Sequence, residues 1–103
     1  MGDRINISSG APWEPIAGYS RAVRVGQFIE VAGTTAVDSQ GNFFGEGDVV
    51  AQTQYVLEKI QLAIEQAGGT MSDVVRTRIY VTDREYMMDV AEVHGKFLSL
   101  IHI

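Results

Sequence analysis

Side chains able to do acid–base or metal chemistry are scarce in this chain of 103 residues. It has two histidines, His94 and His102, and no cysteine. The histidines do not stand at a spacing that recurs among metal ligands, and a structural zinc site needs four nitrogen, sulfur or oxygen ligands. We therefore expect no metal and no cofactor, and we interpret His94 as an ordinary residue on a helix face.

Nucleophile and anion-binding motifs are equally sparse. No serine lies in a Gly-x-Ser-x-Gly nucleophile elbow, and no pair of carboxylates stands out from the acidic surface. Gly45-Glu46-Gly47 is too short for a phosphate-binding loop. Arg76 and Arg78 share one side of a predicted strand and suggest a binding site. Because arginine is usually exposed, we favour a solvated strand face or the rim of an interface.

The element around which the chain is organised is a predicted β-hairpin over residues 19–35. Two alternating arms rich in Val, Ile and Phe flank Gly26-Gln27, a pair that a type II′ turn accepts. Gly33 ends the second arm. It is either a simple strand-end glycine, which we favour, or a place where a ligand or a neighbouring chain comes close to the backbone.

Before the hairpin, residues 5–7 predict a short edge strand and residues 8–15 a loop rich in Ser, Gly and Pro. Trp13 lies in that loop. It has a large apolar area to bury, either against the chain's own core, which we favour, or against another subunit.

Beyond the hairpin, residues 38–42 predict a turn and residues 48–67 an amphipathic helix, with Asp48 as N-cap and Gly68-Gly69 as the stop. Residues 74–81 predict a strand. A second amphipathic helix is predicted to begin at Thr82, because Thr82-x-x-Glu85 is a capping-box pattern.

This order of elements predicts one small α+β domain, with two helices packed on one face of a mixed sheet. The other sheet face would then meet another chain, so a closed homo-oligomer is expected. The net charge of -5 disfavours nucleic-acid binding. The absence of cysteine, of a signal peptide and of a membrane-spanning run leads us to expect a cytoplasmic protein with no membrane partner.

Three segments carry a family resemblance: GYSRAVRVGQFIEVAGTTAVDSQG, then AQTQYVLEKIQLAIEQAGGTMSDVVRTRIYVTD, then the helix ending near Phe97. From Gly10 to Phe97 the chain resembles the RidA/YjgF family of enamine and imine deaminases. The resemblance implies a chorismate-mutase-like fold and a homotrimer, with sheets lining the centre, helices outside and ligand clefts between subunits.

The resemblance also implies site residues. Tyr19 matches a tyrosine in the cleft, and Gly33 a glycine whose backbone borders it. Ala32 stands where typical deaminases have a serine, Ala91 where they have an asparagine, and Met87 where an aromatic residue is usual. The family's arginine, which holds the substrate carboxylate, and its water-positioning glutamate are expected after the second helix. The catalytic residues are therefore not identified in this sequence.

Residues 98–103, LSLIHI, depart from the family pattern and read as an in-frame translation of a transposon sequencing adapter. A natural apolar tail is the alternative. We expect residues 1–97 to be a single RidA-like domain lacking its C-terminal strands, residues 98–103 to be a non-native tail, and the 103-residue chain to be inactive.

Two functions follow as hypotheses. The first is hydrolysis of a reactive 2-imino or 2-enamino acid to the 2-keto acid and ammonia. The second is a non-catalytic trimer that binds a small metabolite in the same cleft, which Ala32 and Ala91 make credible. An older family interpretation, ribonuclease or translation inhibitor, disagrees with the acidic charge.

Overall fold

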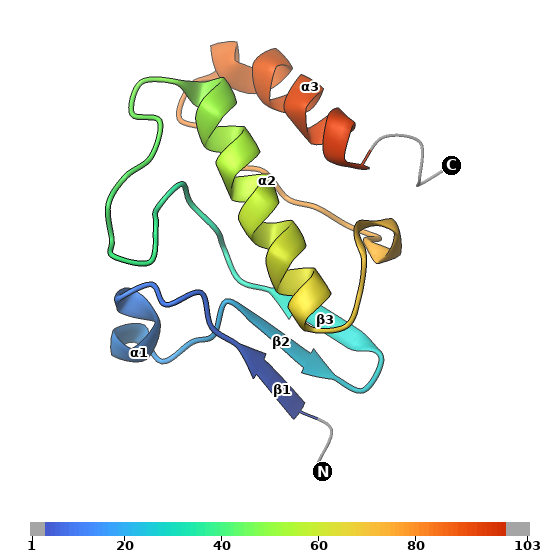
Figure 1. Ribbon diagram of the computed structural model, residues 1–103. Coiled ribbons are helices and arrows are strands. Elements are labelled where there is room, and N and C mark those ends of the chain that lie inside the picture. Colours follow the sequence, from blue (N-terminus) through green and yellow to red (C-terminus); the bar gives the residue numbers. More distant parts are fainter. Residues whose placement is uncertain (1–3, 99–103) are drawn as a thin grey trace.

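The computed structural model describes residues 4–98, which form an α+β arrangement (Figure 1). Its helices and strands follow one another as β1 (Arg4–Ile7), α1 (Trp13–Ala17), β2 (Ala22–Val25), β3 (Phe28–Val31), α2 (Val49–Gln66) and α3 (Met87–Leu98), with 3-10 turns at Met71–Asp73 and Arg84–Tyr86. Of the tail predicted over residues 98–103, Leu98 ends α3 and is buried. Residues 99–103 lie outside the described part.

The sheet is antiparallel, in the order β1-β2-β3. It confirms the hairpin: Val25 pairs with Phe28 across Gly26-Gln27, and Gly26 has the positive φ of 60° that a tight turn requires. It also confirms the edge strand, since Ile7 pairs with Ala22.

The segment between β1 and β2 is only partly the predicted loop. Residues 13–17 form the short helix α1, which Gly18 ends in a left-handed conformation while its N–H donates to the Glu14 carbonyl. Trp13 is 37% exposed and lies against the Gly41 turn, so the prediction that it closes over the core is wrong. Its packing on another subunit stays a prediction.

The predicted strand over residues 74–81 is wrong for this structure, and so is the mixed sheet that depended on it. The segment is drawn out between the Met71–Asp73 turn and α3 (Figure 1), but within residues 4–98 it pairs with no strand. Alternating Val and Ile residues favour an extended backbone, but a strand exists only where a neighbour completes its hydrogen-bond ladder. Val75 and Tyr80 are accordingly 94% and 84% exposed.

Helix α2 forms as predicted. The Asp48 carboxylate caps its N-terminus by accepting a hydrogen bond from the Ala51 N–H, and Gly68, with φ of 93°, follows its end. The start predicted for the second helix at Thr82 is wrong, because α3 begins at Met87 after the 3-10 turn Arg84–Tyr86. Asp83, not Thr82, is the N-cap of the turn that leads into α3, because its carboxylate accepts from the Glu85 N–H.

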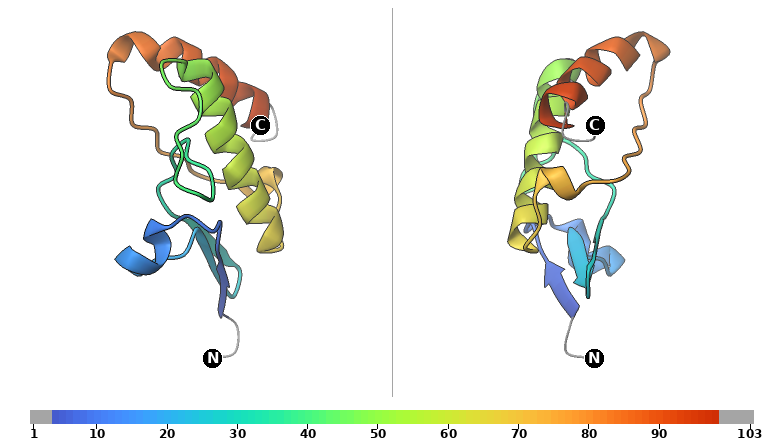
Figure 2. Two further views of the ribbon diagram at one scale, coloured as in Figure 1. Left: turned by 60° about the vertical axis from the view of Figure 1, so that its left-hand side comes forward. Right: turned by 90° about the vertical axis from the view of Figure 1, so that its right-hand side faces the viewer.

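Helix α2 lies between the sheet and α3 (Figures 1 and 2). Its C-terminal end is tied to the hairpin by Arg24, whose Nη1 donates to the Ala67 carbonyl at 2.8 Å. In the core, Ile64 packs with Met71 and Leu98, and Val31 of β3 packs against them. Within residues 4–98, α2 makes the larger contact with the sheet, through β3, whereas α3 packs mainly on α2. No helix within residues 4–98 is long and apolar enough to cross a bilayer.

Candidate functional site

Tyr19, Ala32 and Gly33 come together at the open end of the hairpin. The Ala32 N–H donates to the Arg21 carbonyl at 3.0 Å, so the ladder continues one residue past β3. Tyr19 is half-buried just before β2, and Gly33 is exposed just after β3. Strand pairing alone thus brings three of the five predicted site residues to one end of the sheet.

Arg21 holds this end of the hairpin together. Its Nη2 donates to the Gly33 carbonyl at 2.7 Å, and its guanidinium carbon lies 5.5 Å from the centre of the Tyr19 ring. The side chain is only 3% exposed. A charge-assisted hydrogen bond combined with a cation–π contact fixes a tyrosine ring and a backbone carbonyl relative to one another.

Sequence reasoning missed Arg21 as a site residue. The alternation of the first hairpin arm places Arg21 on the same side as Val23 and Val25, so a charged residue stands on an apolar side. Arginine is rarely buried unless it is paired. A charged residue on an apolar side is therefore the sequence feature that indicates a buried and paired Arg21.

Gly33 has no packing reason to be a glycine within the described part of the chain. A Cβ placed on it would meet no atom within 4 Å, and its φ is not in the left-handed region. Its N–H donates to no acceptor within residues 4–98. Open space and an available donor are what a ligand or a second chain would need here.

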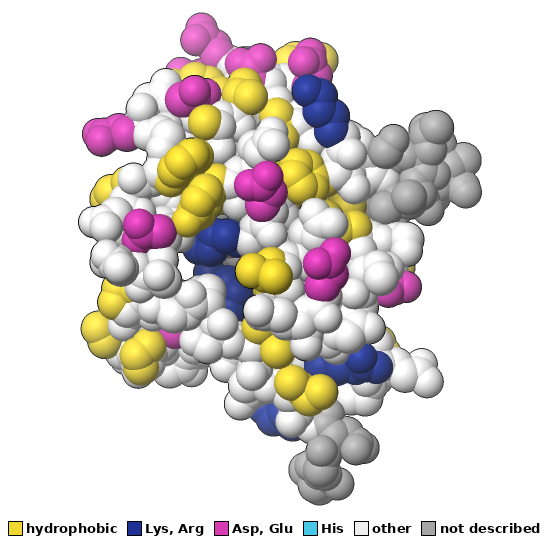
Figure 3. Space-filling view, in the orientation of Figure 1, with side chains coloured by type: hydrophobic (Ala, Val, Ile, Leu, Met, Phe, Trp, Pro, Cys, Tyr) yellow, Lys and Arg dark blue, Asp and Glu magenta, His cyan; other side chains and the backbone are white. Residues whose placement is uncertain are grey.

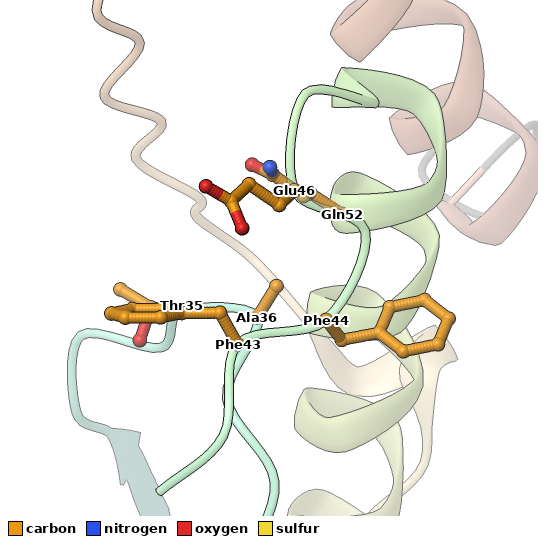
Figure 4. A pocket seen from close by; sticks show the side chains of 6 residues that line it. All are labelled: Thr35, Ala36, Phe43, Phe44, Glu46 and Gln52. Carbon is orange, nitrogen blue, oxygen red and sulfur yellow. The ribbon is translucent and has the colours of Figure 1, made fainter.

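A hollow of about 340 Å³ lies beyond Gly33 (Figure 4). It is lined by Thr35, Ala36, Phe43, Phe44, Glu46 and Gln52. The two phenylalanine side chains point in opposite directions. Phe44 stacks on Tyr55 of α2 with ring centres 4.6 Å apart, whereas Phe43 is 79% exposed. The hollow is therefore lined by the ring of Phe44, which is held against α2, and by the largely exposed ring of Phe43.

Lys59 of α2 fixes the segment between Gly33 and this hollow. Its Nζ donates to the Val37 carbonyl at 2.7 Å and to the Thr35 carbonyl at 3.3 Å. Burial, and then the positive charge of Arg21, lower the pKa of Lys59 below its ordinary value. The sequence analysis had no reason to single out this lysine.

Glu14 is the buried carboxylate of the region, at 3% exposure. It accepts hydrogen bonds from the hydroxyls of Ser8 and Ser9 and from the Ser9 N–H. Burial alone would raise its pKa, but these hydrogen bonds and the charge of Arg21 together lower it. The helical turn of α1 makes this contact possible, and a loop prediction did not include it.

The other predicted site residues lie elsewhere. Met87 and Ala91 are exposed on α3, which packs on α2, so the contacts within residues 4–98 do not bring them to Tyr19 or Gly33. Arg76 and Arg78 are exposed, which agrees with a solvated face. His94 Nε2 lies 3.0 Å from the Thr77 hydroxyl. Within the described part, no three His, Cys, Asp or Glu side chains gather to hold a metal ion.

Comparison with known proteins agrees with this architecture. The family model described as Endoribonuclease L-PSP matches residues 9–102. A RutC family protein of Pyrococcus abyssi is 34% identical over 99 residues, covering 96% of this chain and 77% of the relative.

Two solved structures extend the comparison. One is a member of the YjgF/YER057c/UK114 family from Mycobacterium tuberculosis, with 46% identity, a TM-score of 0.83, and coverage of 96% of this chain and 77% of the other. The second is RidA from an Antarctic Psychrobacter bacterium, with 34% identity, a TM-score of 0.72, and coverage of 80% and 66%. The chain belongs to the RidA/YjgF family, whose family model carries the description Endoribonuclease L-PSP.

Proposed function

We propose that the protein hydrolyses reactive 2-imino or 2-enamino acids to 2-keto acids and ammonia. Family membership and the 34% identity to a protein named RidA support this proposal. The observation that carries it is the open space over Gly33, next to a tyrosine that Arg21 holds in place. A glycine that packs on nothing, beside a fixed aromatic ring, suits the close approach of a small planar substrate.

The chemistry needs only water and positioning. Water adds to C2 of the protonated imine, and the tetrahedral adduct then releases ammonia and leaves the 2-keto acid. Placing the planar imine on the Tyr19 ring and directing the Gly33 N–H to a substrate oxygen would orient C2 toward water. Such orientation is a recognised source of rate acceleration, and donors aimed at developing charge add to it.

The cleft is proposed to be completed by a second copy of the chain in a homotrimer. Met87 and Ala91 would then reach the hairpin end of a neighbouring subunit, which would reconcile their position on α3 with a shared site. Sedimentation of the protein tests this assembly. Three subunits are expected at micromolar concentration, and a monomer would overturn the proposal of a shared cleft.

Turnover tests the activity. An amino acid oxidase generates 2-iminobutanoate in place, and semicarbazide traps whatever imine has not been hydrolysed. The protein should lower the amount of trapped imine as its concentration rises. An unchanged amount at equimolar protein and oxidase would refute the deaminase proposal.

The alternative is a trimer that binds a small metabolite without turning it over. Ala32 favours this alternative, because its side chain adds no polar group beside Gly33. Calorimetric binding of 2-oxobutanoate without any acceleration of imine decay would select it. Ribonuclease activity is suggested by the family model's description. The net charge of -5 opposes ribonuclease activity, since an acidic protein repels a polyanion.

We also propose a reducing compartment such as the cytoplasm, because the chain has no cysteine.

A further inference from the structure

A second hollow, also of about 340 Å³, lies between the segment after β1, the segment after β3 and α2. Arg21 and Lys59 line it together with the apolar side chains of Ile7, Val37 and Leu62. Figure 3 shows basic side chains recessed in the middle of this face. None of the residues that line the first hollow lines this one.

Within residues 4–98, the two cations beside this hollow are not bonded to any carboxylate. The hydrogen bonds of Arg21 and Lys59 go to backbone carbonyls, which carry no charge. The Arg21 Nε is buried and has no partner within residues 4–98. Buried donors are nearly always paired, so an unpaired one asks for an explanation.

Glu14 supplies one countercharge for the two cations, and its carboxylate is already occupied by Ser8 and Ser9. Asp38 also lines the hollow, but its carboxylate accepts from the N–H groups of Gln40 and Asn42 in the exposed turn. Within residues 4–98, neither carboxylate accepts a hydrogen bond from Arg21 or Lys59, so the two cations have no directly bonded anion.

The lowered pKa of Lys59 agrees with the lack of a directly bonded anion. Burial is its first cause, and the charge of Arg21 is the next. An anion placed between the two cations would oppose both causes, since it would favour the charged form of the amine.

We propose that this hollow binds a short-chain monocarboxylate, with its carboxylate on Arg21 and Lys59 and its alkyl chain against Ile7, Val37 and Leu62. A carboxylate would give the two cations a directly bonded anion, and the apolar side chains would cover its alkyl chain. A volume of this size, mostly apolar with a few converging polar groups, is typical of small-molecule sites. This site would exist whether or not the cleft beside Gly33 hydrolyses imines, so it does not depend on the proposed function.

Lysine-selective NMR tests the proposal on the unaltered protein. The chain has two lysines, Lys59 and Lys96, and Lys96 lies exposed in the last turn of α3. With 13C-labelled lysine, butyrate should shift the Cε signal of Lys59 in a saturable way and leave that of Lys96 in place, at constant ionic strength. Equal shifts of both signals, or of neither, would overturn the proposal.

Matched variants and anions sharpen the test. In Lys59→Gln the apparent dissociation constant of butyrate, measured by thermal shift, should rise about tenfold or more, because a charge-assisted hydrogen bond is lost. In Lys96→Gln it should not change. Should Lys59→Gln fail to fold, the NMR titration decides alone.

A series of anions tests the contact of the alkyl chain with the apolar side chains. Acetate should bind more weakly than butyrate, and equal affinities for the two would show that the alkyl chain makes no such contact, which would overturn the proposal. Phosphate should also bind more weakly, and tighter binding of phosphate would overturn the monocarboxylate assignment.

Discussion

The Nη2 of Arg21 donates a hydrogen bond of 2.7 Å to the carbonyl oxygen of Gly33 and so links the two strands at the open end of the hairpin. Arg21 lies just before β2, and Gly33 lies just after β3. This hydrogen bond therefore joins the two chain segments that flank the hairpin at its open end. The same guanidinium lies beside the Tyr19 ring. The geometry of the proposed cleft therefore depends on a residue that does not itself match a family site position.

Arg21→Met should lower the free energy of unfolding by about 1.5 to 3 kcal/mol, because the Gly33 carbonyl loses a charged donor that the methionine cannot replace. Urea denaturation measures this. Arg76→Met, on an exposed arginine, is the matched control and should stay within about 0.5 kcal/mol of the parent. A gain in stability from Arg21→Met would mean that burying the guanidinium costs more than its bonds return, and would contradict the prediction.

Gly33→Ala should leave stability within about 0.5 kcal/mol of the parent, because the new Cβ meets no atom of the described chain. Gly68→Ala is the contrasting variant. Its Cβ would lie 2.5 Å from Arg24 Nη1 at a φ of 93°, so a loss of about 1 to 2 kcal/mol is expected. Thermal unfolding compares the two.

Imine turnover completes the test of Gly33. If a substrate approaches the backbone at Gly33, the alanine variant should fold normally and turn over imine more slowly. Full activity in a stable Gly33→Ala protein would place the substrate elsewhere.

Tyr19→Phe should lower imine hydrolysis or ligand affinity by roughly 1 kcal/mol if the hydroxyl donates a hydrogen bond to the ligand. Tyr80→Phe, on a tyrosine that is 84% exposed, removes the same atom away from the cleft and should have no effect. Steady-state kinetics on both variants measure the difference. Equal rates in the parent and in Tyr19→Phe would leave Tyr19 with a packing role only.

The elements that the sequence predicts well are those whose signals are local. The Gly26-Gln27 turn and the Asp48 cap of α2 each depend on residues a few positions apart, and both form as expected. The segment over residues 74–81 has equally clear strand periodicity. Its pairing requires a partner elsewhere, and periodicity alone does not supply one.

The site was predictable only in part for the same reason. Tyr19 and Gly33 were found by resemblance, and hairpin pairing then explains why they are neighbours. Arg21, Lys59 and Glu14 are ordinary charged residues in the sequence. Their burial depends on contacts between segments up to 24 residues apart, such as Lys59 with the Thr35 carbonyl. Composition and spacing along the chain do not predict such contacts.

Glu14 should make stability depend on acid pH. Its pKa in the folded protein lies below the ordinary value of 4.5, so its stabilising effect is complete above about pH 4.5 and is lost as the pH falls through the lowered pKa. Glu14→Gln should remove this part of the acid dependence. Glu58→Gln, on an exposed helix position, should keep it. Denaturation curves at several acid pH values measure this, and parallel losses in all three proteins would contradict the assignment.

Lys59 should make the stability of the protein depend on alkaline pH. Its pKa in the folded protein lies below the ordinary 10.5, so at neutral pH the folded state carries the cost of a buried ammonium beside Arg21. As the pH rises from the lowered pKa toward 10.5, the folded state releases its proton before the unfolded state does, and this cost disappears. The stability of the parent relative to Lys59→Gln should therefore rise over that range, as measured by urea denaturation at alkaline pH.

Lys96→Gln is the control for this last measurement, because it removes the same charge from an exposed position. The tyrosines that titrate in the same range are common to all three proteins, so they cancel in the comparison. The neutral amine of Lys59 still donates to the Thr35 and Val37 carbonyls, and the segment after β3 should keep its place. If the parent and Lys59→Gln share one alkaline profile, Lys59 is not buried beside Arg21 as described, and the second hollow lacks the pair of buried cations on which the proposed carboxylate site depends.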